Sequence, residues 1–497
     1  MGLKLEKLKL PSLDVIDAMV PGELRTLTKE WRERIEIYES LLFKARRRQY
    51  GQKSERSEKL GSSGEKTPKA PRGETTKQPS ERYPEARVVV EDIDFSAPVP
   101  CPSCGVAMQD SGMTESSEFL DVKPKEFIIV EQRRHKHRCG KCHGAIVTAP
   151  LPARITPGGS YSDELIVDAS LAKYCDLIPM DRYAKMAGRS GLQDLPPHSL
   201  IKASFRLADF MADICELIKR EVLAESVLRA DETPHRMLEG DEKKRWFLWG
   251  FSTEFACYFE CHNTRSGDVS TEILNASKCL ILLTDVYSGY SKSIRLSNEI
   301  RLKEGRPLIQ AANCNAHARR EFWAGDYDSP KITEDQKIVI EQYKLIYKLN
   351  KESKGLSPEE ILKKRQEMKP HFEAIRAEAE AKVATYSNKS QMASAYNYFL
   401  KNYDGLTLFL TNPLVPIDNN SSERLLRSHV VGRKTWYGTH SRKGAEVAAV
   451  HFSIVETCKL IQVNPREYYM DAVQRIHSKS ELLTPRQYKL QRQEDTC

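Results

Sequence analysis

Residues 227–234 read VLRADETP, so an apolar, β-prone run leads directly into the acidic pair Asp231-Glu232. Two comparable segments follow, RWFLWGF at 245–251 and ACYFEC at 256–261, each separated from the last by a short polar stretch. These segments predict three consecutive strands. Further along, residues 269–275 predict a short helix, CLILLT at 279–284 predicts a buried strand, and PLIQA at 307–311 predicts another strand.

The resulting order, β-β-β-α-β-α-β, is that of a ribonuclease H-like α/β fold. Residues 331–404 are charged and helical without a strand pattern, and helical patterns resume near 420 and from 444 to 477. We therefore expect a multidomain α+β protein. Its ribonuclease H-like catalytic core would comprise residues 225–330 and 405–445, interrupted by a helical insertion at 331–404 and followed by a helical tail at 446–497.

The first 224 residues divide into four expected parts. Apolar residues recur at helical spacing between 21 and 50, which predicts an amphipathic helix in residues 1–51 for DNA binding or oligomerisation. Residues 52–86, rich in Ser, Lys, Glu, Pro and Gly, predict a flexible basic linker. Residues 87–150 surround paired cysteines, and residues 151–224 predict a mostly helical DNA-binding segment.

Composition excludes several classes of protein. Of 497 residues, 40% are hydrophobic and 29% charged, and no apolar run approaches the ~20 residues of a membrane span. The N-terminal residues lack the apolar core of a signal peptide, so we expect a cytoplasmic protein. Between Phe43 and Arg82, 12 Lys/Arg stand against 5 Asp/Glu, which accounts for +7 of the chain's net charge of +8. This basic stretch favours a polyanionic partner or, more simply, a solvated linker.

Four of the 12 cysteines form two CxxC pairs, Cys101/Cys104 and Cys139/Cys142. Thiolates at this spacing can share one tetrahedral ion, and two pairs close a four-sulfur structural zinc site. The segments at 119–122 and 126–130 predict short strands between the pairs, so residues 87–150 predict a zinc ribbon. The simpler alternative is four unligated thiols.

Three acidic residues, Asp231, Asp285 and Glu423, stand where strands end or a helix begins. Carboxylates that converge from such positions can hold two divalent metal ions, Mg²⁺ or Mn²⁺, around a phosphodiester. Asp418 to Ser421 are residue types that favour a helix N-cap, which places Glu423 in a first turn. The simpler interpretations are aspartates that cap turns and a glutamate at the start of a surface helix.

Basic and aromatic side chains accompany these acids. We expect DNA contacts from three groups of residues: Arg46, Arg47, Arg48 and Lys53; His317, Arg319 and Arg320; and Arg424, Arg427, Arg433, Lys434 and Trp436. Cys314 and His317, three residues apart, could form a nucleophile–base pair or half of a metal site, but the sequence reveals no further ligand. Packing beneath the active site is the expected role of Cys314.

In combination, these features resemble the large transposase of the bacterial insertion sequence 66 family. The resemblance covers residues 24–470 and rests on YGQKSER at 50–56, the double CxxC module, ADET at 230–233, TD at 284–285, CNAHARREF at 314–322, DNN and ER at 418–424 and GRK at 432–434. It implies an aspartate–aspartate–glutamate catalytic triad at Asp231, Asp285 and Glu423. It also implies companion proteins from the same mobile element.

We therefore expect a metal-dependent DNA transposase with structural Zn²⁺ and catalytic Mg²⁺ or Mn²⁺. It would cleave DNA at the terminal repeats and join the freed 3′-hydroxyl to target DNA, acting on double-stranded DNA as a homo-oligomer. Alternatives are a ribonuclease H-like nuclease without strand transfer and a domesticated zinc-containing DNA-binding regulator. A zinc hydrolase fits least, because no His-rich set with an open position is evident.

Overall fold

The computed structural model describes residues 78–84, 87–91, 117–121, 125–138, 146–238, 245–323, 333–388 and 390–494, together with residues 20, 26, 31, 100, 102, 106 and 107. Residues 54–129 form one unit, and residues 130–497 belong to a second. All four paired cysteines, Arg46, Arg47, Arg48 and Lys53 lie outside the described residues. Of the expected N-terminal helix, Thr26 and Trp31 are described, and both are helical.

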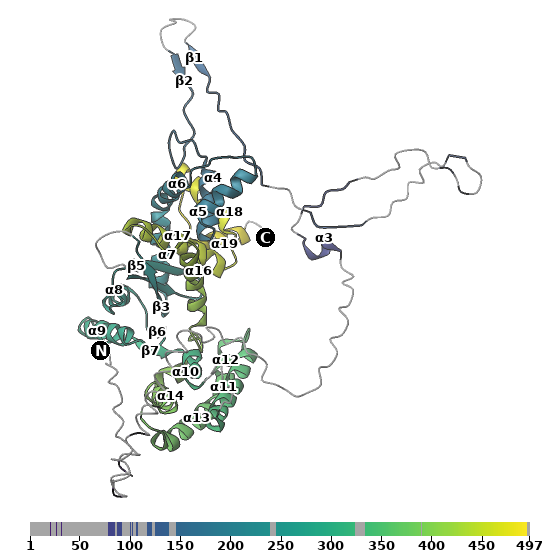
Figure 1. Ribbon diagram of the computed structural model, residues 1–497. Coiled ribbons are helices and arrows are strands. Elements are labelled where there is room, and N and C mark those ends of the chain that lie inside the picture. The colour runs from purple at the N-terminus through teal and green to yellow at the C-terminus, as the bar shows by residue number, and fades with distance from the viewer. Residues whose placement is uncertain are drawn as a thin grey trace. The chain divides into compact units, whose positions relative to one another are not determined.

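A five-stranded sheet forms the centre of the second unit (Figure 1). Its strands are β3 (Val227–Arg236), β4 (Arg245–Ser252), β5 (Cys257–His262), β6 (Ile281–Thr284) and β7 (Gln310–Asn313), in the spatial order β5-β4-β3-β6-β7. β3, β4 and β5 are antiparallel, whereas β6 and β7 run parallel to β3. The expected strand and helix order is therefore present in the described residues.

Helices connect and cover the strands. α8 (Asp268–Ala276) and α9 (Ser288–Lys303) flank β6 in the chain, and α10 (Asn315–Phe322) follows β7. α16 (Asn420–Trp436) packs against β3 and β4, and α17 (Arg442–Leu460) packs against β5. The segment before β3 forms α4 (Asp163–Tyr174), α5 (Met180–Arg189), α6 (Pro197–Phe210) and α7 (Ala212–Ala224). The C-terminal part forms α18 (Pro465–Ser478) and α19 (Pro485–Glu494).

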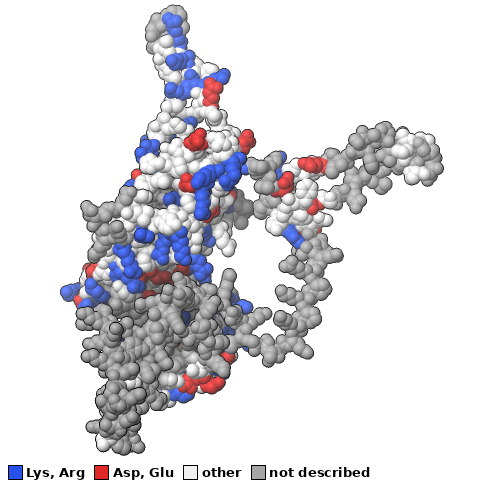
Figure 2. Space-filling model, in the orientation of Figure 1, with Lys and Arg blue, Asp and Glu red and all other residues white. Residues whose placement is uncertain are grey.

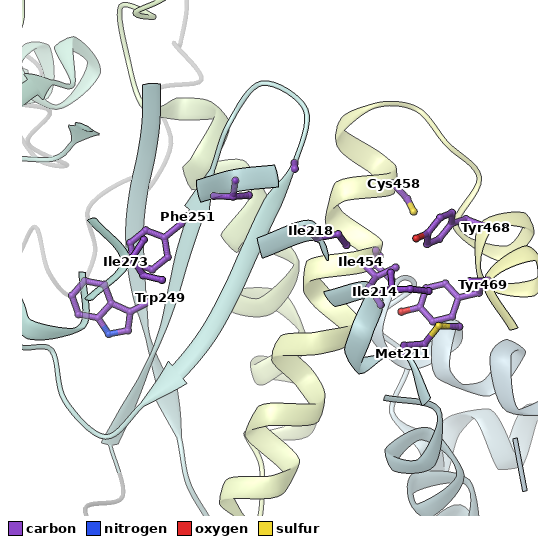
Figure 3. Close-up of a cluster of buried hydrophobic side chains, with 14 of the residues drawn as sticks. Met211, Ile214, Ile218, Trp249, Phe251, Ile273, Ile454, Cys458, Tyr468 and Tyr469 are labelled. Atoms are coloured by element: carbon purple, nitrogen blue, oxygen red, sulfur yellow. The ribbon is translucent and has the colours of Figure 1, made fainter. Parts of the chain in front are cut away.

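Both faces of β4 are buried. Since alternate residues of a strand point to opposite sides of the sheet, this strand contributes to two apolar clusters. Trp249 and Phe251 join a large apolar cluster with Ile218 of α7 and Ile454 of α17 (Figure 3). Leu248 joins a separate cluster with residues of α16 and α17. The expected boundary at 445/446 falls inside α17, whose 13 buried residues make it part of the core.

The helical insertion has its own apolar cluster. The insertion contains α11 (Glu334–Glu352), α12 (Pro358–Gln366), α13 (Lys369–Lys382), η1 (Val383–Thr385) and α14 (Gln391–Lys401). The segments that follow it are α15 (Tyr403–Thr407) and η2 (Leu408–Leu410). Ile281, Leu283 and Ala312 of the sheet belong to the same cluster. The insertion is therefore anchored on β6 and β7, beside the strand end that precedes Asp285.

The cysteine-rich region departs from expectation. The described parts of 119–122 and 126–130 are not strands, because they have no ladder partner within the described residues. Instead, β1 (Lys136–Arg138) pairs antiparallel with β2 (Ile146–Thr148), and these strands flank the second cysteine pair. In the other unit, α3 (Pro79–Arg82) is fixed by a 2.9 Å hydrogen bond from the Ser80 hydroxyl to the Glu118 carboxylate. No helix among the described residues is both long and apolar enough to span a bilayer.

Candidate active site

In the fold, the charges of Asp285 and Glu423 both act on the carboxyl group of Asp231. Asp231 lies within β3, because the strand continues through Arg236 rather than ending at Ala230. Asp285 follows the last residue of the neighbouring strand β6, and Glu423 lies in the first turn of α16. Burial raises the pKa of Asp231 well above its usual range, and the nearby carboxylates of Glu232, Asp285 and Glu423 raise it further.

Local hydrogen bonds fix the conformation around Asp285. The main-chain N–H of Tyr287 donates to Oδ1 of Asp285 at 3.1 Å. The Thr284 hydroxyl donates to the main-chain carbonyl of Asp285 at 2.6 Å. The carboxylate is therefore held at the end of β6 by its own loop, with its other oxygen not engaged in these contacts.

Sequence reasoning did not single out Glu232, which lies beside Asp231 on the opposite face of β3. Its side chain is 1% exposed, and Arg265 pairs with it, donating from Nε to Oε1 at 2.7 Å. The Tyr290 hydroxyl donates to its other oxygen. Burial raises the pKa of Glu232, and the hydrogen bonds from Tyr290 and Arg265 oppose that shift. Little in the sequence signalled this residue, because the β-prone run ends at Ala230 and Glu232 lay outside the predicted strand.

Asn419 connects α16 to the strand that carries Asp231. Residues 418–421 predict a side-chain N-cap, but the Asn419 side chain makes no cap hydrogen bond. Its Nδ2 instead donates to the main-chain carbonyl of Ala230 at 3.0 Å, and its main-chain N–H donates to Sγ of Cys314 at 3.2 Å. Because Ala230 immediately precedes Asp231, this contact sets the position of the Glu423 turn relative to Asp231.

Two further contacts hold the same helix on the sheet. Arg229 of β3 donates to the Ser421 hydroxyl at 2.8 Å, and the hydroxyls of Ser252 and Ser422 are 2.8 Å apart. One helical turn beyond Leu425, His429 faces His235 of β3, with 3.2 Å between ring nitrogens.

The histidine pair is buried and uncharged. Burial, together with the smaller effect of the Arg433 charge, lowers the pKa of His235 to about 4. Burial also lowers the pKa of His429 well below its ordinary value. The sequence placed these residues 194 positions apart, so their pairing could be found only from the fold.

The environment of Glu423 contains basic groups from α10. His317 Nδ1 lies 3.5 Å from Oε1 of Glu423, and Arg320 lies 4.0 Å from Oε2. Cys314 is buried beneath them as the N-cap of α10, which agrees with its expected packing role. Arg319 of the same helix lies over the ring of Tyr347 instead, 5.9 Å from its centroid.

The basic residues of α16 differ in accessibility. Arg424, Arg427 and Lys434 are exposed, and Arg433 is half-buried. Figure 2 shows Lys and Arg side chains over α16 that border a strip of Asp and Glu side chains beside β3.

Trp436 is less available than expected. Lys173 lies over its ring at 4.9 Å, and Tyr174 packs edge-on against it at a centroid distance of 6.5 Å. A Cβ at Gly432 would come within 2.5 Å of the same ring. Tyr437, which is 69% exposed, is therefore the aromatic side chain of this pair that is open to a ligand.

The carboxylates of Asp231, Asp285 and Glu423 are ligands of the kind that divalent cations such as Mg²⁺ prefer. Several carboxylates near a buried Asp231 disfavour its ionised form, and a bound cation would offset that repulsion. The closest cluster is nevertheless a different one. Among the described residues, the one group of three potential ligands whose atoms all lie within 4.8 Å of one another is Cys314, His317 and Glu423.

Comparison with known proteins identifies relatives of this chain. Residues 158–447, more than half of the chain, match the family described as "Transposase IS66 family", and residues 100–143 match the "zinc-finger binding domain of transposase IS66". Three uncharacterized proteins of Sinorhizobium fredii are similar. The protein y4hP is 28% identical over 78% of this chain and 72% of its own length. The protein y4jD is 25% identical over 76% of this chain and 75% of its own length. The protein y4qI is 26% identical over 92% of this chain and 88% of its own length.

Proposed function

The chain belongs to the IS66 family of transposases, and we propose that it performs the DNA chemistry itself, with Asp231, Asp285 and Glu423 as its catalytic carboxylates. It cleaves DNA at the ends of its element and joins the freed 3′-hydroxyl to target DNA. The observation that carries this proposal is that Asp285, at the end of β6, and Glu423, in the first turn of α16, lie near enough to the buried Asp231 of β3 to raise its pKa. The strand order β5-β4-β3-β6-β7, with its antiparallel and parallel halves, supports a ribonuclease H-like core.

The three carboxylates would hold Mg²⁺ or Mn²⁺. Oxygen ligands suit these ions, and the accumulated negative charge around Asp231 supplies the attraction. Bound there, the metal would lower the pKa of the attacking hydroxyl or water and offset charge on the phosphate. Arg320, which lies beside Glu423, would neutralise phosphate charge on the same side.

The remaining parts would recognise DNA. We propose that Cys101, Cys104, Cys139 and Cys142 hold structural zinc, an assignment supported by the zinc-finger match at 100–143. This module, the N-terminal segment at 1–51 and the helices at 151–224 would bind the terminal repeats of the element. The exposed arginines and lysine of α16 would contact the DNA backbone, with the protein acting as a homo-oligomer and companion proteins assisting.

The test compares Asp231→Asn and Glu423→Gln with Glu446→Gln, a matched change of an acid on the neighbouring helix α17 that pairs with Arg442. We expect both active-site variants to lose Mg²⁺-dependent strand cleavage of terminal DNA while retaining DNA binding. Glu446→Gln should cleave like the unaltered protein. Full cleavage by either active-site variant would refute the assignment. Cleavage without joining, in an assay that scores both products, would favour a nuclease over a transposase.

A further inference from the structure

The half-site that Cys314 and His317 suggest in the sequence acquires a third ligand in the fold. Cys314 is the N-cap residue of α10, and His317 lies in the first turn of that helix. Glu423 approaches from α16, more than a hundred residues along the chain. One ligand atom from each of the three side chains lies within 4.8 Å of the other two.

Two of these atoms lack hydrogen-bond partners. Nδ1 of His317 and Oε1 of Glu423 are buried, and neither has a hydrogen-bond partner among the described residues. The 3.5 Å between them is too long for a good hydrogen bond. Buried polar atoms normally find a partner, so two that face each other without one indicate a ligand between them.

Their spacing suits a transition metal. A tetrahedral zinc ion with bonds of about 2.0–2.2 Å to nitrogen and oxygen separates those atoms by about 3.4 Å. The observed separation of Nδ1 and Oε1 is 3.5 Å. Sγ of Cys314 accepts a hydrogen bond from the Asn419 main-chain N–H at 3.2 Å, and because burial raises the pKa of this thiol, a bound metal would displace its proton.

The chemistry of the donors selects the ion. Mg²⁺ prefers oxygen ligands, whereas a sulfur, a nitrogen and an oxygen together suit Zn²⁺ and similar thiophilic ions. Three protein ligands leave one position open, so this set differs from a closed four-cysteine structural site.

We propose that Cys314, His317 and Glu423 form an inhibitory site for a thiophilic divalent cation of the zinc class. The inhibitory part of this inference rests on the proposed catalytic role of Glu423. A zinc-class ion on Oε1 draws the Glu423 carboxylate toward α10 and adds positive charge beside it. Both effects disfavour magnesium held by the same carboxylate together with Asp231 and Asp285.

The first test counts zinc bound by the full chain, without reference to activity. Cys314→Ser and His317→Gln should each bind one equivalent less than the unaltered protein, or bind it at least about tenfold more weakly. Cys261→Ser, which changes a half-buried free thiol elsewhere on the sheet, is the matched control and should bind as the unaltered protein does. The same stoichiometry and affinity in all four proteins would overturn the site. His317, 29% exposed, can be replaced with little risk to folding, so a misfolded Cys314 variant does not weaken the test.

The second test adds Zn²⁺ to cleavage reactions in excess Mg²⁺ and compares rates with and without zinc for each protein. Zinc should inhibit the unaltered protein by about tenfold or more and lose most of that effect on Cys314→Ser. Zinc binding without inhibition would refute the competition for Glu423. Absence of cleavage by the unaltered protein in Mg²⁺ alone would instead contradict the proposed function, while the zinc count would still decide whether the site exists.

Discussion

The position of Glu423 should depend on the side chain of Asn419. Asn419→Ala removes the 3.0 Å hydrogen bond to the carbonyl of Ala230 in a buried environment. Leaving a buried carbonyl short of a donor costs about 1–3 kcal/mol of folding free energy. The same change frees the first turn of α16 from β3, and a displacement of about 1 Å at a catalytic group can lower a rate by about 10²-fold.

A second asparagine provides the control. Nδ2 of Asn298 donates to the Ile309 carbonyl at 2.9 Å, so it also links a helix to a main-chain segment near the sheet. Asn298→Ala also loses the 2.8 Å hydrogen bond from the Ile309 main-chain N–H to Oδ1, but both bonds are only half-buried, so it should cost a similar free energy of unfolding. It should leave cleavage within about twofold of the unaltered protein, since neither Asn298 nor Ile309 belongs to the proposed catalytic set.

Urea denaturation and Mg²⁺-dependent cleavage of terminal DNA, measured on both variants, separate stability from positioning. We expect comparable midpoints for the two variants and a large rate loss for Asn419→Ala only. If Asn419→Ala cleaves as fast as Asn298→Ala, the contact with Ala230 does not position Glu423 and the reasoning fails.

Three other outcomes are expected. Because the folded-state pKa of His235 is about 4, the unfolded chain, with a histidine pKa of about 6.5, takes up the proton first. His235 should therefore contribute about 3 kcal/mol to the loss of stability as pH drops from 6.5 to 4, and the buried His429 and His451, whose pKa values are also lowered, should add to that loss. His235→Gln should make the loss smaller while the exposed His198→Gln should not, and equal curves for both variants in urea denaturation would contradict this. Gly250→Ala places a Cβ 2.8 Å from a ring carbon of Phe259 and should cost about 1–3 kcal/mol, and an unchanged urea midpoint would rule out that clash. Cys101→Ser should lower zinc content and weaken binding to terminal DNA, whereas unchanged zinc content by metal analysis would argue against the ribbon.

The strands that carry two of the acids could be predicted from the sequence, with one boundary wrong. An almost wholly apolar run before Asp285 and a β-prone run before Asp231 predicted strands there; β6 ends just before Asp285, whereas β3 continues past Asp231. Glu423 could be predicted because residue types that favour helix starts precede it. Asn419 is the N-cap residue of α16, as the residue types at 418–421 predict, but its side chain bonds the neighbouring strand instead of capping the helix, which the capping preference does not show.

Partners that arise only from packing could not be predicted. The sequence does not show that Arg265 and Tyr290 converge on Glu232, because those contacts require the β5–α8 connection and α9 to lie against one face of β3. The strands expected between the cysteine pairs failed for a similar reason. A short run of apolar, β-prone residues favours extended backbone, but a strand also needs a partner, and the run does not specify one.

The anchoring of the carboxylates is unequal. Glu423 and Asp231 are joined through several side-chain contacts between α16 and the β3–β4 pair, including those of Asn419 and His429. Asp285 is held mainly by its own loop, through the Tyr287 N–H and the Thr284 hydroxyl. Any closing of the three carboxylates around a cation should therefore be taken up by the loop at 285–287, because β6 itself is hydrogen-bonded to β3 on one side and β7 on the other. The helical insertion packs on β6 and β7 through Ile281, Leu283 and Ala312, so it supports the strands from which that loop extends.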